Sequence, residues 1–250
     1  MPNPTQSLAK RRVAARSLST AIAPLERRYV AALRGLAKQV AGEYMRVLEP
    51  HIAARADSSL PSELEVLGMR VHLAVERTVG PLYDRHAKAV AAANARSMRL
   101  IGIAPPTDAG VAEQIAQRRA ENIDLVVKAQ RAYAQSVSDI FNAPENFGLG
   151  VDELKAQLLE RGNVSESRAE LIARDQTLKL NGAITEIRQT NAGVQEYVWS
   201  TSNDERVRDE HAALEGQRFS WDSPPAVGHP GEDFQCRCVA VPVIAELEGL

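Results

Sequence analysis

Apolar residues recur at steps of three and four over three long stretches of the chain. The stretches cover residues 24 to about 55, residues 62 to about 100, and residues 108 to about 141. This spacing places the apolar side chains on one face of an α-helix. We therefore expect three long amphipathic helices, with Pro81 kinking or splitting the second.

The character of the sequence changes after a turn-rich segment at residues 142–150. This segment contains Pro144, Gly148 and Gly150, residues that interrupt regular secondary structure. We expect a domain boundary here, with residues 1–148 forming a helical region that docks on other proteins. Residues 149–250 are expected to form a separate module.

Residues 149–250 begin with helical spacing and then alternate as strands do. We expect one helix over residues 151–161, ended by Gly162, and a longer one over about 165–190. After Gly193 the apolar period shortens to two, which predicts strands over residues 194–201, 217–221 and 236–242, with a short helix over 206–214. The expected fold class is α+β: long amino-terminal helices followed by a small module with a short antiparallel sheet.

Charge is distributed unevenly along the chain. Residues 1–100 carry sixteen basic against eight acidic side chains, whereas residues 151–250 carry ten against eighteen. The basic amino-terminal region, which includes Lys10, Arg11, Arg12 and Arg16, is one candidate surface for packaged DNA. The alternative is a set of solvated helix faces.

The chain contains neither a continuous apolar run of about 18 residues, as a membrane span requires, nor the pattern of a secretory signal. We therefore expect no membrane partner and assembly in the cytoplasm.

Metal-ligating residue types are concentrated near the carboxy terminus. Both cysteines of the chain, Cys236 and Cys238, lie there with His211 and His229. If residues 236–242 form a strand, the two thiols point to the same side, and the four residues make a Cys2His2 set suited to tetrahedral zinc. The alternative is that the cysteines are small buried side chains and the histidines bind the backbone.

Catalysis is a third interpretation of the same region. A hydrolase or nuclease could use metal-binding or acid–base residues of the set Asp204, Asp209, His211, His229 and Asp233. The sequence lacks a His-Glu-x-x-His helix, a phosphate-binding glycine loop and a Gly-x-Ser-x-Gly elbow, so nothing in it requires an enzyme. In the structural alternative, Asp204 caps the short helix, Arg208 binds a carboxylate through two nitrogens, and Trp199 belongs to the core.

The same region resembles the Mu F-like phage head morphogenesis family, which includes minor head proteins of phages Mu and SPP1. The family pattern is a tryptophan-containing strand, a Thr-x-x-Asp-x-x-x-Arg-x-x-His run, a Leu-x-Gly, a Pro-Gly turn and a Cys-x-Cys before the last strand. Upstream, Arg174 lies in an Ile-Ala-Arg stretch similar to that of the family, although Asp175-Gln176 departs from the family's Thr-Glu. The positions that carry the pattern are Trp199, Thr201, Asp204, Arg208, His211, Leu214, Gly216, Pro230, Gly231, Cys236 and Cys238.

The resemblance covers residues 150–243 and implies a structural minor head protein of a phage or prophage. Such a protein associates with the portal and other head proteins and supports head assembly and DNA packaging or ejection. Its location would be the virion, in the head interior or at the portal vertex. The resemblance implies no catalytic activity, and structural zinc is the one cofactor that the residues suggest.

Overall fold

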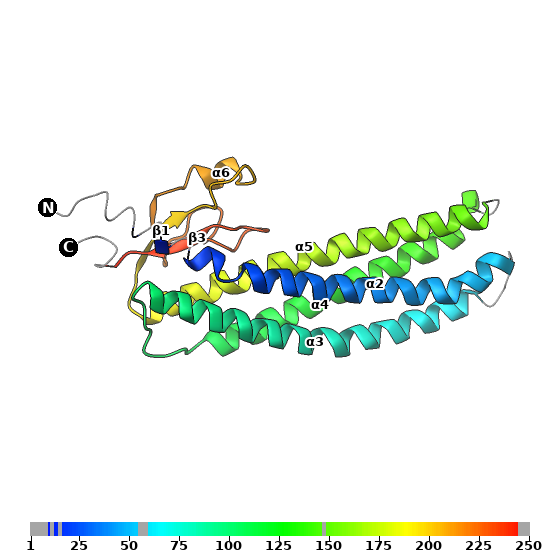
Figure 1. Cartoon of the computed structure of the whole chain (residues 1–250), viewed down its shortest axis with the longest axis horizontal. Helices are drawn as coiled ribbons and strands as arrows, with labels where there is room; N and C mark the ends of the chain where they lie inside the picture. The colour runs from blue at the N-terminus through cyan, green and yellow to red at the C-terminus, as the bar shows by residue number, and fades with distance from the viewer. Residues whose placement is uncertain (1–9, 11–12, 15–16, 55–59, 147–148, 245–250) are drawn as a thin grey trace. The chain divides into compact units, whose positions relative to one another are not determined.

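Four long helices and a small sheet make up the described part of the chain (Figure 1). The computed structural model describes residues 10, 13–14, 17–54, 60–146 and 149–244. The helices are α2 (Ala23–Ala54), α3 (Leu60–Leu100), α4 (Val111–Asn142), the 3-10 turn η1 (Pro144–Asn146), α5 (Val151–Asn191) and α6 (Asp209–Ala212). The strands are β1 (Glu196–Ser200), β2 (Arg218–Ser220) and β3 (Val239–Pro242). The predicted α+β fold class is confirmed.

The helices α2, α3 and α4 match the three helices predicted from apolar spacing. The helix α3 continues through Pro81 without splitting, so of the two expected effects of Pro81 only a kink stays a prediction. The expected helix end at Gly162 is wrong, because α5 continues through it. A Cβ added at Gly162 would lie 3.4 Å from the Cβ of Ala41, which is a van der Waals contact, so Gly162 faces α2. The glycine therefore lies inside a packed helix and does not terminate it.

The chain forms two compact units, and each long helix contributes a segment to both. One unit, residues 28–84 and 119–173, consists in its described part of helices and short connections. Its core contains paired tyrosines: Tyr44 and Tyr133 meet edge to face at 5.5 Å, and the Tyr29 hydroxyl donates to Asn122 Oδ1 at 2.6 Å. Residues 1–27, 85–118 and 174–250 make the other unit, which we call the sheet unit. The expected division into residues 1–148 and 149–250 stays a prediction.

The sheet has the order β2-β1-β3, with both pairs antiparallel. Side chains alternate between its faces, as strand geometry requires. Tyr197 and Trp199 of β1 join the two cysteines and Trp221 in one buried cluster. Val198 of β1 and Val241 of β3 join a second cluster with Leu18 and Met98. Both faces of this short sheet are therefore covered.

The sequence analysis expected no membrane partner and offered the basic amino-terminal region as a candidate DNA-binding surface. Among the described residues, no helix is long and apolar enough to span a bilayer. Lys10 is exposed, whereas Arg11, Arg12 and Arg16 lie outside the described residues. DNA binding through the amino-terminal region therefore stays a prediction.

Candidate functional site

Three of the four predicted metal ligands come together in the sheet unit. The Nδ1 atom of His211 lies 3.5 Å from Cys236 Sγ and 3.6 Å from Cys238 Sγ. All three side chains are buried, with exposed fractions of 2%, 3% and 7%. His211 comes from α6, whereas both cysteines come from the segment that enters β3. We call this set the thiol–imidazole cluster.

The two cysteines face His211 for a different reason from the one expected. They precede β3, which begins at Val239, so they are not on a strand as predicted. The pairing of β1 with β3 stops at Ser200 and Val239, and the Cys236 N–H donates to the Asp233 carbonyl in a turn. The segment has no β1 partner along residues 236–238, yet Cys236 and Cys238 still point to one side while Arg237 points elsewhere.

A carboxylate holds His211 from the side opposite the thiols. Asp233 Oδ2 lies 3.1 Å from His211 Nε2 and 2.5 Å from an Arg208 guanidinium nitrogen. Arg208 also donates from two nitrogens to the Phe234 carbonyl, at 3.1 and 3.0 Å. Burial raises the pKa of Asp233, but the Phe234 N–H, Arg208 and His211 together lower that pKa below its usual value. The ionised carboxylate therefore accepts a hydrogen bond from the Nε2–H of His211.

The pKa values of the two thiols shift in opposite directions in this arrangement. A hydrogen bond from Cys238 lowers the pKa of Cys236; burial opposes this effect, and the Gly231 N–H at 3.4 Å adds to it. The same hydrogen bond, together with burial, raises the pKa of Cys238. Proton loss from this pair is therefore easier at Cys236 than at Cys238.

His229, the fourth predicted ligand, contacts aromatic side chains instead of the thiols. Its Nδ1 is 2.9 Å from the Tyr197 hydroxyl, and its ring centre is 4.9 Å from that of Trp221. Its backbone N–H donates to Glu232 Oε2 at 2.6 Å. The structure therefore places His229 with aromatic side chains and outside the thiol–imidazole cluster.

Asp204 does not cap α6, contrary to expectation. The N-cap position of α6 is Arg208, and Asp204 instead binds the guanidinium of Arg237 through both of its oxygens, each at 2.6 Å. Arg237 lies between the two cysteines in sequence, so this ion pair ties the Asp204 loop to the segment that carries both thiols. The bidentate arginine–carboxylate pair predicted for Arg208 therefore occurs at Arg237 instead.

We predict that Asp204→Asn destabilises the protein in a pH-dependent manner. The hydrogen bonds from Arg237, opposed by burial and helped by the Arg206 N–H, lower the pKa of Asp204 from 3.8 to about 2. A carboxylate with a lowered folded-state pKa contributes stability above its unfolded pKa and loses it as the pH falls. In urea denaturation, the gap between wild type and variant should be constant at neutral pH and shrink below about pH 4. Glu205→Gln, an exposed neighbour, is the control, and a gap that does not change with pH would contradict the assignment.

The remaining family-pattern residues shape the same region. Trp199 is fully buried and packs its indole edge to face against His211, at 5.5 Å. The Thr201 N–H donates to Glu215 Oε2 at 2.5 Å. Gly216 has φ +76°, and its N–H donates to the Trp199 carbonyl at 2.9 Å. Arg174 forms an ion pair with Glu26 at 3.5 Å.

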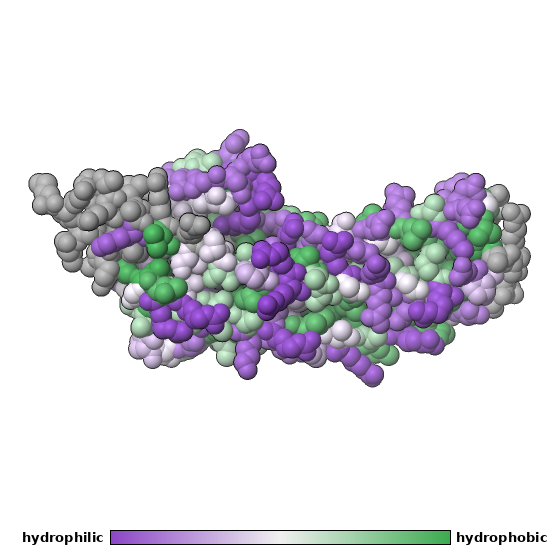
Figure 2. All heavy atoms as spheres, viewed as in Figure 1, coloured by the Kyte–Doolittle hydropathy of each residue, from purple (hydrophilic) through white to green (hydrophobic). Residues whose placement is uncertain are grey.

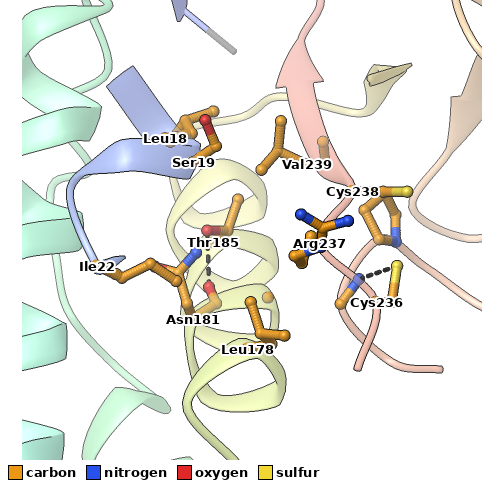
Figure 3. Close-up of a pocket in the computed structure, with 14 residues that line it drawn as sticks. Leu18, Ser19, Ile22, Leu178, Asn181, Thr185, Cys236, Arg237, Cys238 and Val239 are labelled. Atoms are coloured by element: carbon orange, nitrogen blue, oxygen red, sulfur yellow. Dashed lines mark hydrogen bonds between the residues drawn. The ribbon is translucent and has the colours of Figure 1, made fainter. Parts of the chain in front are cut away.

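The Pro230-Gly231 turn packs directly on α5. A Cβ added at Gly182 of α5 would lie 2.8 Å from the Pro230 carbonyl oxygen. Figure 3 shows a pocket beside this contact, where the segment of Cys236 and Cys238 faces Asn181 and Thr185 of α5 and the segment of Leu18 and Ile22. The cysteines therefore border a small pocket within the sheet unit.

Comparison with known proteins identifies this region. Residues 135–241 match the model of a family described as "Phage Mu protein F like protein". This segment therefore resembles the Mu F-like family of phage head morphogenesis proteins. The resemblance inferred from the Trp199-to-Cys238 pattern is confirmed.

An uncharacterized protein of Haemophilus influenzae is 42% identical to this chain over 136 residues, or 54% of the chain. The match covers 30% of that protein's length, so the chain corresponds to only part of this relative. No solved structure matches the chain. The Mu F-like assignment therefore rests on the family model and on the motif geometry.

Some residues that hold the Mu F-like motif together were missed in the sequence. No role was predicted for Arg237 or Gly182, and Asp233 was predicted only as a metal-binding or acid–base residue of a hydrolase or nuclease. Asp175, where the chain departs from the family pattern, is 5% exposed and accepts the Gln235 N–H at 2.9 Å. The role of Arg237 could have been anticipated from its place between the two cysteines. In an extended segment, neighbouring side chains point to opposite sides, so the arginine points away from the thiols.

Proposed function

We propose that this chain is a structural minor head protein that associates with the portal and supports head assembly and DNA packaging or ejection. The observation that carries the proposal is the Mu F-like match over residues 135–241. The way the motif residues are used also supports it. Asp204 is held by Arg237, and Asp233 by Arg208 and His211, so these charged side chains stabilise loops of the fold.

The helical region offers a row of exposed apolar side chains for such an association. Val66, Met69 and Leu73 of α3 are 51%, 56% and 51% exposed. Their spacing of three and four residues places them along one face of the helix. Figure 2 shows hydrophobic residues interspersed with hydrophilic ones on the molecular surface. We call the three residues the α3 row and propose that it contacts the portal.

Copurification tests the portal association. A tagged copy of the full chain should retain the portal protein encoded in the same phage or prophage genome when the two are expressed together. The major capsid protein from that genome, expressed with the tagged chain in a separate culture, measures binding to head proteins in general. Failure to retain the portal in repeated preparations of folded protein would refute this association.

We predict that the double variant Met69→Glu, Leu73→Glu weakens portal binding by about tenfold or more, because interface energy concentrates in a few apolar contacts. Both side chains are more than half exposed, so the thermal midpoint of the isolated chain should change little. Leu100→Glu is the matched control, since Leu100 is 79% exposed on the same helix but outside the row. Equal portal binding by the wild type, the double variant and Leu100→Glu would contradict a role for the α3 row.

A further inference from the structure

We propose that His211, Cys236 and Cys238 together bind one zinc ion, with Asp233 as the residue that orients the imidazole. The proposal goes beyond the head function and does not depend on it. The three ligand atoms lie within 4.8 Å of one another on buried side chains. The ligand set is thus smaller than the four residues that the sequence suggested, because His229 is not part of it.

The separations between ligand atoms fit tetrahedral zinc. Zinc binds thiolate sulfur at about 2.3 Å and imidazole nitrogen at about 2.0–2.1 Å. With a tetrahedral angle between the two bonds, these lengths place nitrogen and sulfur roughly 3.6 Å apart. The observed distances from His211 Nδ1 to the two sulfurs are 3.5 and 3.6 Å. Both donor pairs therefore already have the separation that a shared ion requires.

Hydrogen bonding alone accounts less well for this geometry. Asp233 Oδ2 can only accept, so His211 carries its proton on Nε2 and presents a single lone pair on Nδ1. One lone pair accepts one S–H directly, yet two sulfurs lie at nearly the same distance from it. A cation placed between the nitrogen and both sulfurs satisfies all three at once.

Asp233 completes an arrangement that is common around protein-bound zinc. A histidine ligand usually donates its second ring N–H to a carboxylate, which fixes the tautomer and increases the basicity of the ligating nitrogen. Here Arg208 also binds that carboxylate, so the orientation of His211 is set by two further side chains. Three protein ligands leave a fourth tetrahedral position for a water molecule.

The bound ion would connect parts of the sheet unit that are distant in sequence. His211 lies on α6, between β1 and β2, and the cysteines precede β3. An ion shared by these segments would tie the connection between β1 and β2 to the connection between β2 and β3. The chelated protein should therefore have a lower thermal midpoint, and added zinc should restore it.

Metal content of the purified full chain tests the proposal. Protein produced in zinc-supplemented medium and dialysed against metal-free buffer should contain about one zinc per chain. The variants Cys236→Ser, Cys238→Ser and His211→Gln should each lose most of this zinc. His229→Gln is the matched control, a second buried histidine of the same unit, and it should keep its zinc.

A second measurement uses the unaltered protein, in case the ligand variants fail to fold. Chelated wild type titrated with cobalt(II) should develop the sulfur-to-cobalt absorption band and the intense visible bands of a tetrahedral cobalt site. The bands should saturate at about one equivalent and disappear when zinc is added. Wild type that contains no zinc and shows no such bands would overturn the proposal, and loss of zinc from His229→Gln would overturn the three-residue ligand set. Portal binding and virion content are measured separately, so failure here leaves the head function intact.

Discussion

Replacing Gly182 with alanine should lower the free energy of unfolding by about 2 kcal/mol, although alanine favours helices over glycine. The added Cβ would lie 2.8 Å from the Pro230 carbonyl oxygen and 3.3 Å from Gly231 Cα. Both are backbone atoms, so relief requires α5 or the Pro230-Gly231 turn to move. Overpacking of this kind costs about 3 kcal/mol, and the gain in helix propensity offsets about 1 kcal/mol of it.

Urea denaturation of a matched pair measures this effect. Gly35 is in α2 and has no atom within 4 Å of an added Cβ, so Gly35→Ala should be neutral or stabilising by up to about 1 kcal/mol. Gly231→Ala should destabilise the protein as Gly182→Ala does, because Gly231 has φ +95° and faces the same contact. If Gly182→Ala proved as stable as Gly35→Ala, the close approach of α5 and the turn would be wrong.

The buried His86 should make the protein lose about 3 kcal/mol of stability between pH 7 and pH 4. Burial lowers the pKa of His86 from 6.5 to about 4, and its Nε2 lies 2.9 Å from the Thr177 hydroxyl. Between these two pKa values the unfolded chain binds a proton that the folded protein does not. Acidification therefore favours unfolding, beginning near pH 6.5 and complete near pH 4.

Comparison of variants separates this effect from the other titrating groups. His86→Gln removes the titrating group, so its stability should fall less steeply than that of wild type from pH 7 to pH 4. His72→Gln, at a partly exposed histidine, should leave the steep wild-type dependence unchanged. Parallel curves for wild type and His86→Gln would show that His86 does not titrate as inferred.

The long helices could be predicted from sequence because apolar spacing depends on local chain geometry. The interruptions were harder, since the effect of a glycine depends on what lies opposite it. Glycine is a weak helix former, yet α5 continues through Gly162, which packs against Ala41 of α2. That contact joins residues that are far apart in sequence, and local patterns contain no information about it.

The residue types of the candidate site could be predicted from the sequence, but which side chains contact one another could be predicted only in part. The sequence predicted a metal site at Cys236 and Cys238, and the structure brings His211 to both cysteines. It could not distinguish His211 from His229, because both lie in loops whose paths depend on tertiary packing. Arg237, and not Arg208 as predicted, binds a carboxylate through two nitrogens. This difference also depends on the paths of the loops.

Protein composition of purified particles tests the central claim, a structural role in the phage head, most directly. Particles released from the phage or prophage that encodes this chain should be purified by density gradient and analysed by quantitative mass spectrometry. The account predicts that the chain is present in full heads, in far fewer copies than the major capsid protein. A chain that is abundant in the lysate but absent from both full heads and their assembly precursors would contradict it.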